Sequence, residues 1–157
     1  MSEARHPNAA ARQPLGVILL TFNSASVIER TVRAALAVSR SVFIVDSGSS
    51  DDTVAIATRM GCEVVNRPFK HYADQRNWAI DEFGARSDWQ LHLDADEVLD
   101  DVAIAEIKRV LAAPGEATGF IFRRRTYFMG QALRFGGNDN FHLRLFKTGT
   151  ARCSPRR

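Results

Sequence analysis

The sequence predicts an α/β domain built on a largely parallel sheet. Four short apolar runs alternate with four stretches of helical periodicity between residues 16 and 112. Such an alternation is typical of parallel strands joined by right-handed helical crossovers. Of the 157 residues, 45% are hydrophobic, which is enough for one core. We therefore expect one domain overall.

The first predicted unit follows a polar leader. Residues 1–14 mix Ala, Arg, Pro and His without a period and are expected to be disordered. Residues 16–21 form a continuous apolar run, as in a strand buried on both faces. Ser26 and Glu29 have the spacing of a capping box, which predicts that a helix opens there and runs to about Leu36.

The second unit repeats this pattern. Residues 41–46 are a second apolar run and predict a second buried strand. Ser49 and Asp52 are expected to cap a helix that ends at about Met60. Residues 62–66 then predict the third strand.

The fourth predicted strand lies between the last two predicted helices in the sequence. A helix is expected from Tyr72 to about Phe83, and residues 89–93 predict a strand that ends directly on Asp94. Residues 100–112 carry apolar positions at helical spacing and predict the fourth helix. Residues 15–119 are therefore the α/β region of the chain.

Beyond Gly119 the character of the sequence changes. Residues 120–128 are aromatic and prone to form strands, residues 143–146 resemble another strand, and glycines separate these segments. We expect antiparallel strands or loops added to one edge of the sheet within residues 120–157.

Charge is unevenly distributed along the chain. Residues 120–157 contain nine Lys or Arg residues and one acidic residue, although the whole chain carries a net charge of only +3. A basic segment suggests a phosphate-bearing partner, and a solvated charged face is the alternative. No apolar run is long enough to span a membrane, and residues 1–14 lack the apolar core of a signal peptide. We expect a cytoplasmic protein, and peripheral contact with the inner face of a membrane stays open.

Polar clusters follow three of the predicted strands. They are residues 21–23, 46–51 and 94–97. Because ligands bind beyond the carboxyl ends of strands in an open parallel sheet, we expect these clusters to converge on one crevice. Each cluster alone is also compatible with ordinary turn chemistry.

The acidic cluster Asp94-Ala95-Asp96-Glu97 predicts a divalent metal. If the chain stays extended there, Asp94 and Asp96 project to one side and repel each other unless a cation lies between them. Mg²⁺ and Mn²⁺ accept one or two carboxylates and complete their coordination with phosphate oxygens and water. An acidic turn before a helix is the alternative. His92, inside the fourth strand, is expected to be a packed core histidine.

Several other chemistries find no support in the sequence. There is no P-loop spacing and no glycine-rich dinucleotide fingerprint. Cys62 and Cys153 do not have the spacing of metal ligands. No recognised nucleic-acid motif accompanies the basic residues, so a nucleic-acid partner is not expected. A nucleotidyltransferase is disfavoured because no glycine-rich loop follows the first strand.

Five blocks of sequence resemble the family-2 inverting glycosyltransferases of GT-A fold. Residues 17–23, 45–53 and 93–97 match that family in order and spacing, and residues 75–77 and 144–146 are similar to its lipopolysaccharide-core β-glucosyltransferase subgroup. The resemblance covers about residues 16–152. It implies a three-layer, Rossmann-like nucleotide-diphospho-sugar transferase fold with a mostly parallel sheet.

The resemblance also implies a set of donor-binding residues. They are Thr21, Phe22, Asn23, Asp46, Ser47, Gln75, Arg76, Asn77, Asp94 and Arg144. Asp46 would contact the base or ribose of a uridine diphosphate sugar, and Arg76 and Arg144 would pair with phosphate. Asp94 and Asp96 match the Asp-x-Asp motif of the family, with Asp96 as the direct ligand of Mg²⁺ or Mn²⁺.

The implied reaction is transfer of a hexose, with inversion, to a glycan or lipid-linked acceptor in lipopolysaccharide or cell-surface polysaccharide synthesis. The family carries a carboxylate base after the strand that matches residues 144–146, whereas the sole carboxylate in residues 120–157 is Asp139. We therefore expect the family's general base to be missing from this chain, and Asp139 is the one candidate for an improvised base. We expect a C-terminally truncated chain in which residues 120–157 begin an incomplete acceptor-side region. A non-catalytic nucleotide-sugar-binding protein is the alternative.

Overall fold

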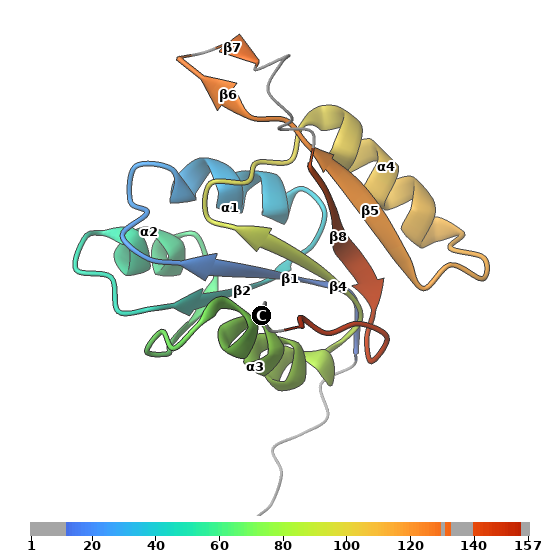
Figure 1. Ribbon diagram of the computed structural model, residues 1–157, viewed down its shortest axis with the longest axis horizontal. Helices are drawn as coiled ribbons and strands as arrows, with labels where there is room; N and C mark the ends of the chain where they lie inside the picture. Colours follow the sequence, from blue (N-terminus) through green and yellow to red (C-terminus); the bar gives the residue numbers. More distant parts are fainter. Residues whose placement is uncertain (1–11, 130, 133–139, 155–157) are drawn as a thin grey trace, which may run out of the picture.

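The computed structural model describes residues 12–129, 131–132 and 140–154 (Figure 1). Most of the expected leader, residues 1–14, lies outside this part of the chain, and so does the candidate base Asp139. The described residues form three layers, with α1, α2 and α4 on one face of a sheet and α3 on the other (Figure 1). The predicted α/β class is confirmed.

Strands and helices alternate in the predicted order. The elements are β1 (Gln13–Thr21), α1 (Ile28–Leu36), β2 (Ser41–Asp46), α2 (Thr53–Arg59), β3 (Glu63–Asn66), α3 (Tyr72–Gly84), β4 (Ser87–Asp94), α4 (Asp101–Ala112), β5 (Gly119–Arg124), β6 (Tyr127–Phe128), β7 (Gln131–Ala132) and β8 (Asn140–Lys147). The observed bounds of β2 are those predicted, and β1 begins three residues earlier than expected. No helix in the described ranges has the length and apolar character needed to cross a membrane.

The main sheet has the strand order β3-β2-β1-β4-β8-β5. β1 pairs in parallel with both β2 and β4, and β3 extends the parallel part beyond β2. β8 lies antiparallel to β4, and β5 lies antiparallel to β8. The prediction of antiparallel strands on one edge is therefore confirmed, and β6 and β7 form a separate two-stranded sheet.

Alternate side chains of β1 enter two separate cores. Val17 and Leu19 belong to the larger core under α1, α2 and α4, and Ile18 belongs to the smaller core with α3. All three side chains have no exposed surface. A strand with both faces covered must be apolar at every position, which explains the continuous run in the sequence.

The predicted capping box at the start of α1 is wrong. The helix begins at Ile28, and its N-cap residue is Val27, which makes no side-chain cap hydrogen bond. The backbone N–H groups of Val27 and Ile28 instead donate to the carbonyl oxygen of Ser24, at 3.0 and 2.9 Å. A backbone turn thus takes the place of the predicted Ser26–Glu29 box.

The predicted cap of α2 is wrong as well. Its N-cap residue, Asp52, makes no side-chain cap hydrogen bond. Asp51 Oδ1 accepts from the Thr53 backbone N–H at 3.0 Å. The Ser49 hydroxyl instead accepts from the Asn23 backbone N–H, in the turn after β1, and donates to Asp46 at the end of β2. Ser49 is therefore used in tertiary hydrogen bonds, and Asp51 accepts the hydrogen bond from the backbone at the start of the helix.

Candidate functional site

The three polar clusters meet at one edge of the sheet. In the parallel register Thr21 lies opposite Asp46, and Leu20 lies opposite Asp94. Thr21 Oγ1 donates to Asp46 Oδ1 at 2.9 Å. The carboxyl ends of β1, β2 and β4 therefore carry their polar side chains to a shared edge, as expected for an open parallel sheet.

Asp46 organises the turn that follows β2. Its carboxylate has no exposed surface and accepts from the backbone N–H groups of Gly48 and Ser49 at 2.9 and 2.7 Å. Gly48 has φ 94°, a left-handed conformation that favours glycine. The resemblance implied that Asp46 contacts a base or ribose, whereas here its oxygens are used within the protein. The carboxylate fixes the shape of residues 46–49.

The turns after β1 and β2 are bonded to each other. The Asn23 backbone N–H donates to Ser49 Oγ at 2.8 Å, and Asn23 Oδ1 accepts from the Ser50 backbone N–H at 2.9 Å. Asn23 has φ 45°, which asparagine tolerates better than most residues. Phe22, held between β1 and this junction, leaves 59% of its surface exposed. An aromatic face is thus available beside a rigid polar turn.

The chain does not stay extended after Asp94, so the condition under which Asp94 and Asp96 would project to one side is not met. Residues 95–96 form a turn, which the Glu97 backbone N–H closes on the Asp94 carbonyl at 2.9 Å. Ala95 packs into the core, and its carbonyl accepts from Thr31 Oγ1 at 2.6 Å, which holds the turn in place. Alternation therefore does not set the direction of Asp96. Its side chain is exposed and makes no hydrogen bond or ion pair to another described residue.

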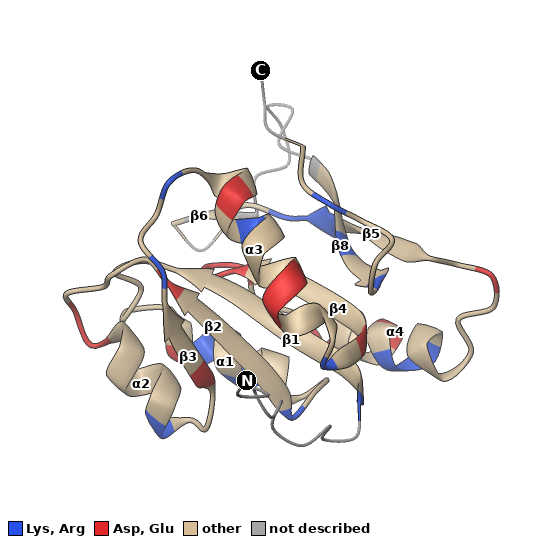
Figure 2. Ribbon diagram, turned by 90° about the horizontal axis from the view of Figure 1, so that it is seen from below, with Lys and Arg blue, Asp and Glu red and all other residues tan. Residues whose placement is uncertain are grey.

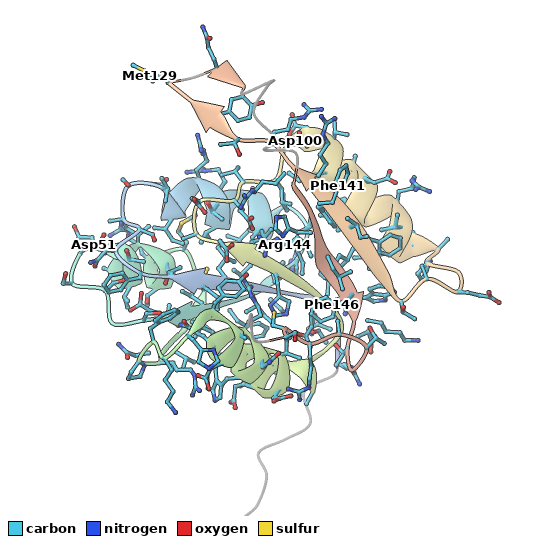
Figure 3. The ribbon with its side chains drawn as sticks, in the orientation of Figure 1. Asp51, Asp100, Met129, Phe141, Arg144 and Phe146 are labelled. Carbon is cyan, nitrogen blue, oxygen red and sulfur yellow. The ribbon has the colours of Figure 1, made fainter. Side chains whose placement is uncertain are left out.

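Asp94 is held between two arginines. Arg76 Nη2 lies 2.6 Å from Oδ1, and Arg144 Nη2 lies 3.2 Å from Oδ2. Arg144 also pairs with Glu97, and Figure 3 places Arg144 beside the carboxyl end of β4. Burial works against the charge of Arg144, but the Glu97 and Asp94 carboxylates raise the pKa of its guanidinium. Both arginines are therefore already paired with carboxylates.

Basic residues continue along β5 and β8, as Figure 2 shows. Arg124 of β5 lies 3.8 Å from Glu97, and 43% of its side chain is exposed. Arg144, in contrast, is only 10% exposed. Arg124 is thus the more accessible cation of the two that approach Glu97.

Three consecutive residues of α3 hold three different segments. Gln75 Nε2 donates to Ser47 Oγ at 2.8 Å, and Arg76 binds Asp94. The Asn77 amide donates to the Cys153 carbonyl and accepts from its N–H, at 2.9 and 2.8 Å. Gln75 and Arg76 are each 2% exposed. These residues therefore join α3 to the turn after β2, to the end of β4 and to the segment after β8, and Arg76 is covered from solvent.

His92 is a core histidine, as predicted, with 2% of its surface exposed. Burial lowers its pKa well below the usual value, and the charges of Arg76 and Arg144 lower it further. Two residues of this network were not singled out from the sequence. They are Tyr72, whose hydroxyl accepts from Arg76 Nη2 at 2.7 Å, and Gln90, whose Oε1 lies 2.9 Å from His92 Nε2. The alternation of Gln90, His92 and Asp94 along β4 is the signal that could have found Gln90.

The carboxylates at this edge fit a metal that arrives with its ligand. Within the described ranges, no three His, Cys, Asp or Glu side chains are grouped to hold an ion by themselves. Asp96 is exposed, and 31% of the Asp94 side chain is also exposed. Magnesium and manganese need only one or two carboxylates when phosphate oxygens and water complete their coordination.

Sequence comparison assigns the family. The model of glycosyl transferase family 2 matches residues 16–153. This chain belongs to glycosyl transferase family 2. It is 33% identical over 106 residues to an uncharacterised glycosyltransferase of Rickettsia conorii, covering 68% of this chain and 37% of that protein. It is 27% identical over 145 residues to the lipopolysaccharide core biosynthesis glycosyltransferase LpsC of Rhizobium meliloti, covering 88% of this chain and 53% of LpsC. The chain thus spans between about a third and about half of these relatives.

Solved structures agree with the family 2 assignment at the level of the fold. S. aureus TarS superimposes with a TM-score of 0.53 at 20% identity, over 64% of this chain and 32% of TarS. Glucosyl-3-phosphoglycerate synthase of Mycobacterium tuberculosis, in complex with uridine diphosphate, gives 0.52 at 22% identity, over 71% of this chain and 45% of that one. The fold expected from the resemblance, GT-A, is therefore confirmed.

Proposed function

We propose that this chain binds a nucleoside-diphosphate sugar, a uridine diphosphate hexose, at the carboxyl ends of β1, β2 and β4. The protein would transfer the hexose with inversion to a glycan or lipid-linked acceptor at the inner face of a membrane. Membership of glycosyl transferase family 2 supports the reaction class. The likeness to LpsC, named for lipopolysaccharide core biosynthesis, supports a role in lipopolysaccharide or cell-surface polysaccharide synthesis.

One observation carries the donor site. The exposed carboxylate of Asp96 has no partner among the described residues and lies two residues beyond a strand end whose Asp94 is fixed by two ion pairs. Because this carboxylate forms no ion pair within the described part of the chain, it is free to accept a cation carried by a diphosphate.

Burial divides the proposed donor-site residues into two groups. Those with exposed surface are proposed to touch the donor, and they are Phe22, Asn23, Ser47, Asp94 and Asp96. The buried residues, and Asn77, whose amide is bonded to the Cys153 backbone, are proposed to hold the first group in place. They are Thr21, Asp46, Gln75, Arg76, Asn77 and Arg144. Phe22 offers an apolar face for the base, because aromatic side chains stack on nucleobases.

Asp96 and Asp94 would hold Mg²⁺ or Mn²⁺, with Asp96 as the direct ligand. When bound, the ion neutralises charge on the departing diphosphate. The protein's own contribution is to keep Asp94 fixed between Arg76 and Arg144 and to present Asp96 to solvent. The basic residues of β5, with Arg124 43% exposed, would face an acceptor that carries phosphate.

Calorimetric titration of uridine diphosphate glucose, with and without Mn²⁺, tests the proposal. We expect binding that EDTA abolishes and that Asp96→Ala weakens at least tenfold. The melting temperature should not change, because Asp96 has no partner among the described residues. Glu116→Ala, which removes an exposed carboxylate from the loop between α4 and β5, is the matched control. Binding that does not need a metal and that Asp96→Ala leaves unchanged would refute the proposed site.

Donor binding without transfer is the second candidate function. It applies if Asp139, the one carboxylate within residues 120–157, does not act as the base. In that case the chain would bind the donor as above but would release uridine diphosphate no faster than a sample without protein. Release above that background, to water or to an added acceptor, would favour the transferase.

A further inference from the structure

Strand β4 has a polar face inside the protein. On one face of the strand, Trp89, Leu91 and Leu93 belong to the larger apolar core. Gln90, His92 and Asp94 alternate with them and project to the opposite face, toward α3. Gln90 and His92 are 0% and 2% exposed. Burying two polar side chains beside a fixed carboxylate is costly unless each one is hydrogen-bonded.

These side chains form one directed series of hydrogen bonds. Arg76 Nη1 lies 3.1 Å from His92 Nδ1, and His92 Nε2 lies 2.9 Å from Gln90 Oε1. Gln90 Nε2 lies 3.3 Å from the Ile80 carbonyl oxygen. The series begins and ends on α3, one helical turn apart, and passes through two residues of β4. It therefore joins the helix to the strand that carries Asp94.

The residues at the two ends of the series determine which ring nitrogen of His92 carries the hydrogen. A guanidinium can only donate, so Arg76 requires an unprotonated Nδ1. A carbonyl can only accept, so Ile80 requires the amide nitrogen of Gln90 on its side and leaves Oε1 facing His92. His92 Nε2 must then carry the hydrogen. Phe146 stacks on the imidazole, with ring centroids 5.0 Å apart and planes 11° apart, and fixes its plane.

We propose that His92 and Gln90 are positioning residues, which lock the Arg76 guanidinium so that it holds the Asp94 carboxylate toward the donor. This inference rests on the proposed donor site. Arg76 has several rotatable bonds, and ordering such a side chain carries an entropic cost. Nη1 is held by His92, and Nη2 reaches both Asp94 Oδ1 and the Tyr72 hydroxyl, at 2.6 and 2.7 Å.

Two NMR measurements on the protein without donor test the lock directly. Nitrogen-15 correlation spectra of the His92 ring should report the neutral tautomer with hydrogen on Nε2. The Arg76 guanidinium should show restricted rotation that His92→Phe removes and His92→Asn preserves, because the Asn amide oxygen can replace Nδ1 as acceptor. A hydrogen on Nδ1, or free rotation of the wild-type guanidinium, would overturn the inference.

A titration with uridine diphosphate and Mn²⁺ then tests the consequence for the donor. Loss of a hydrogen bond to a charged group should make His92→Phe bind on the order of tenfold more weakly, whereas His92→Asn should lose less than about threefold. A role in packing alone predicts the reverse order, because Phe keeps the stacking on Phe146. Val110→Ala, a packing change in α4 on the opposite face, controls for lost stability. If the wild-type chain does not bind uridine diphosphate, the proposed function fails, and the NMR measurements decide the inference alone.

Discussion

Replacing the two partners of the Arg76–Asp94 ion pair, singly and together, is the most direct test of the edge of the sheet. The pair is 2.6 Å long, with 2% of the Arg76 side chain and 31% of the Asp94 side chain exposed. Arg76→Met keeps an unbranched apolar stem and removes the charge. Asp94→Asn keeps the shape of the carboxylate. The double variant completes a thermodynamic cycle that isolates the coupling between the two groups.

The expected coupling is about 2 kcal/mol. Breaking a fully buried ion pair costs about 3–5 kcal/mol, and an exposed pair contributes about 0–1 kcal/mol. Asp94 is partly exposed and keeps its second contact, Arg144 at 3.2 Å, when Arg76 is replaced. Solvent and the remaining arginine both compensate for the lost partner, so the value should fall between these limits.

Urea unfolding of the wild type, the two single variants and the double variant gives the four free energies. The exposed pair Arg33–Glu29 on α1, with side chains 73% and 60% exposed, is the matched control, and its coupling should be close to zero. A coupling between Arg76 and Asp94 no larger than that of the control would refute the reasoning. It would mean that Arg76 is retained for packing against its neighbours and does not hold Asp94.

Two further changes test the packing and the electrostatics of the fold. Gly16→Ala should lower the free energy of unfolding by about 1–3 kcal/mol, because the new methyl group would lie 2.8 Å from Ser87 Oγ between β1 and β4. Adding Ser87→Ala should restore part of that loss in urea unfolding. Hydrogen bonds from the Thr53 side chain and the Ala25 backbone lower the pKa of Asp51 below its ordinary value of 3.8. A lowered pKa contributes stability that is present above that value and lost on further acidification, so Asp51→Asn should be less stable than wild type at pH 7, and the difference should vanish at pH values well below 3.8. A difference that persists unchanged in acid would contradict this origin.

The fold could be predicted because strands buried on both faces leave a simple trace in the sequence. Residues 42–45 are all apolar, and the strand has the predicted bounds, Ser41–Asp46. The convergence of Thr21, Asp46 and Asp94 on one edge also followed, because parallel strands end at the same edge of a sheet. Both inferences depend on periodicity and direction alone.

Local spacing failed where tertiary hydrogen bonds compete with it. Ser49 has the position of a cap, but its hydroxyl accepts from Asn23 in the turn after β1 and donates to Asp46 at the end of β2. The sequence left open whether the chain is extended or turns after Asp94, because the turn depends on a contact across the fold, between the Ala95 carbonyl and Thr31. Such partners are distant in sequence and leave no periodic signal.

Arg76 and Arg144 are already paired with carboxylates, which limits the positive charge that they can offer to a diphosphate. The resemblance assigned Arg76 and Arg144 to phosphate, but Asp94 and Glu97 already neutralise them, and the two guanidinium groups are at most 10% exposed. A diphosphate that approached these arginines alone would have to displace carboxylates from short, partly buried contacts, which is costly. A cation bound to the exposed Asp96 would carry new positive charge to the same edge without breaking either pair. We therefore propose that the donor arrives with its metal and that its binding depends on Asp96, because the two arginines are buried and already paired.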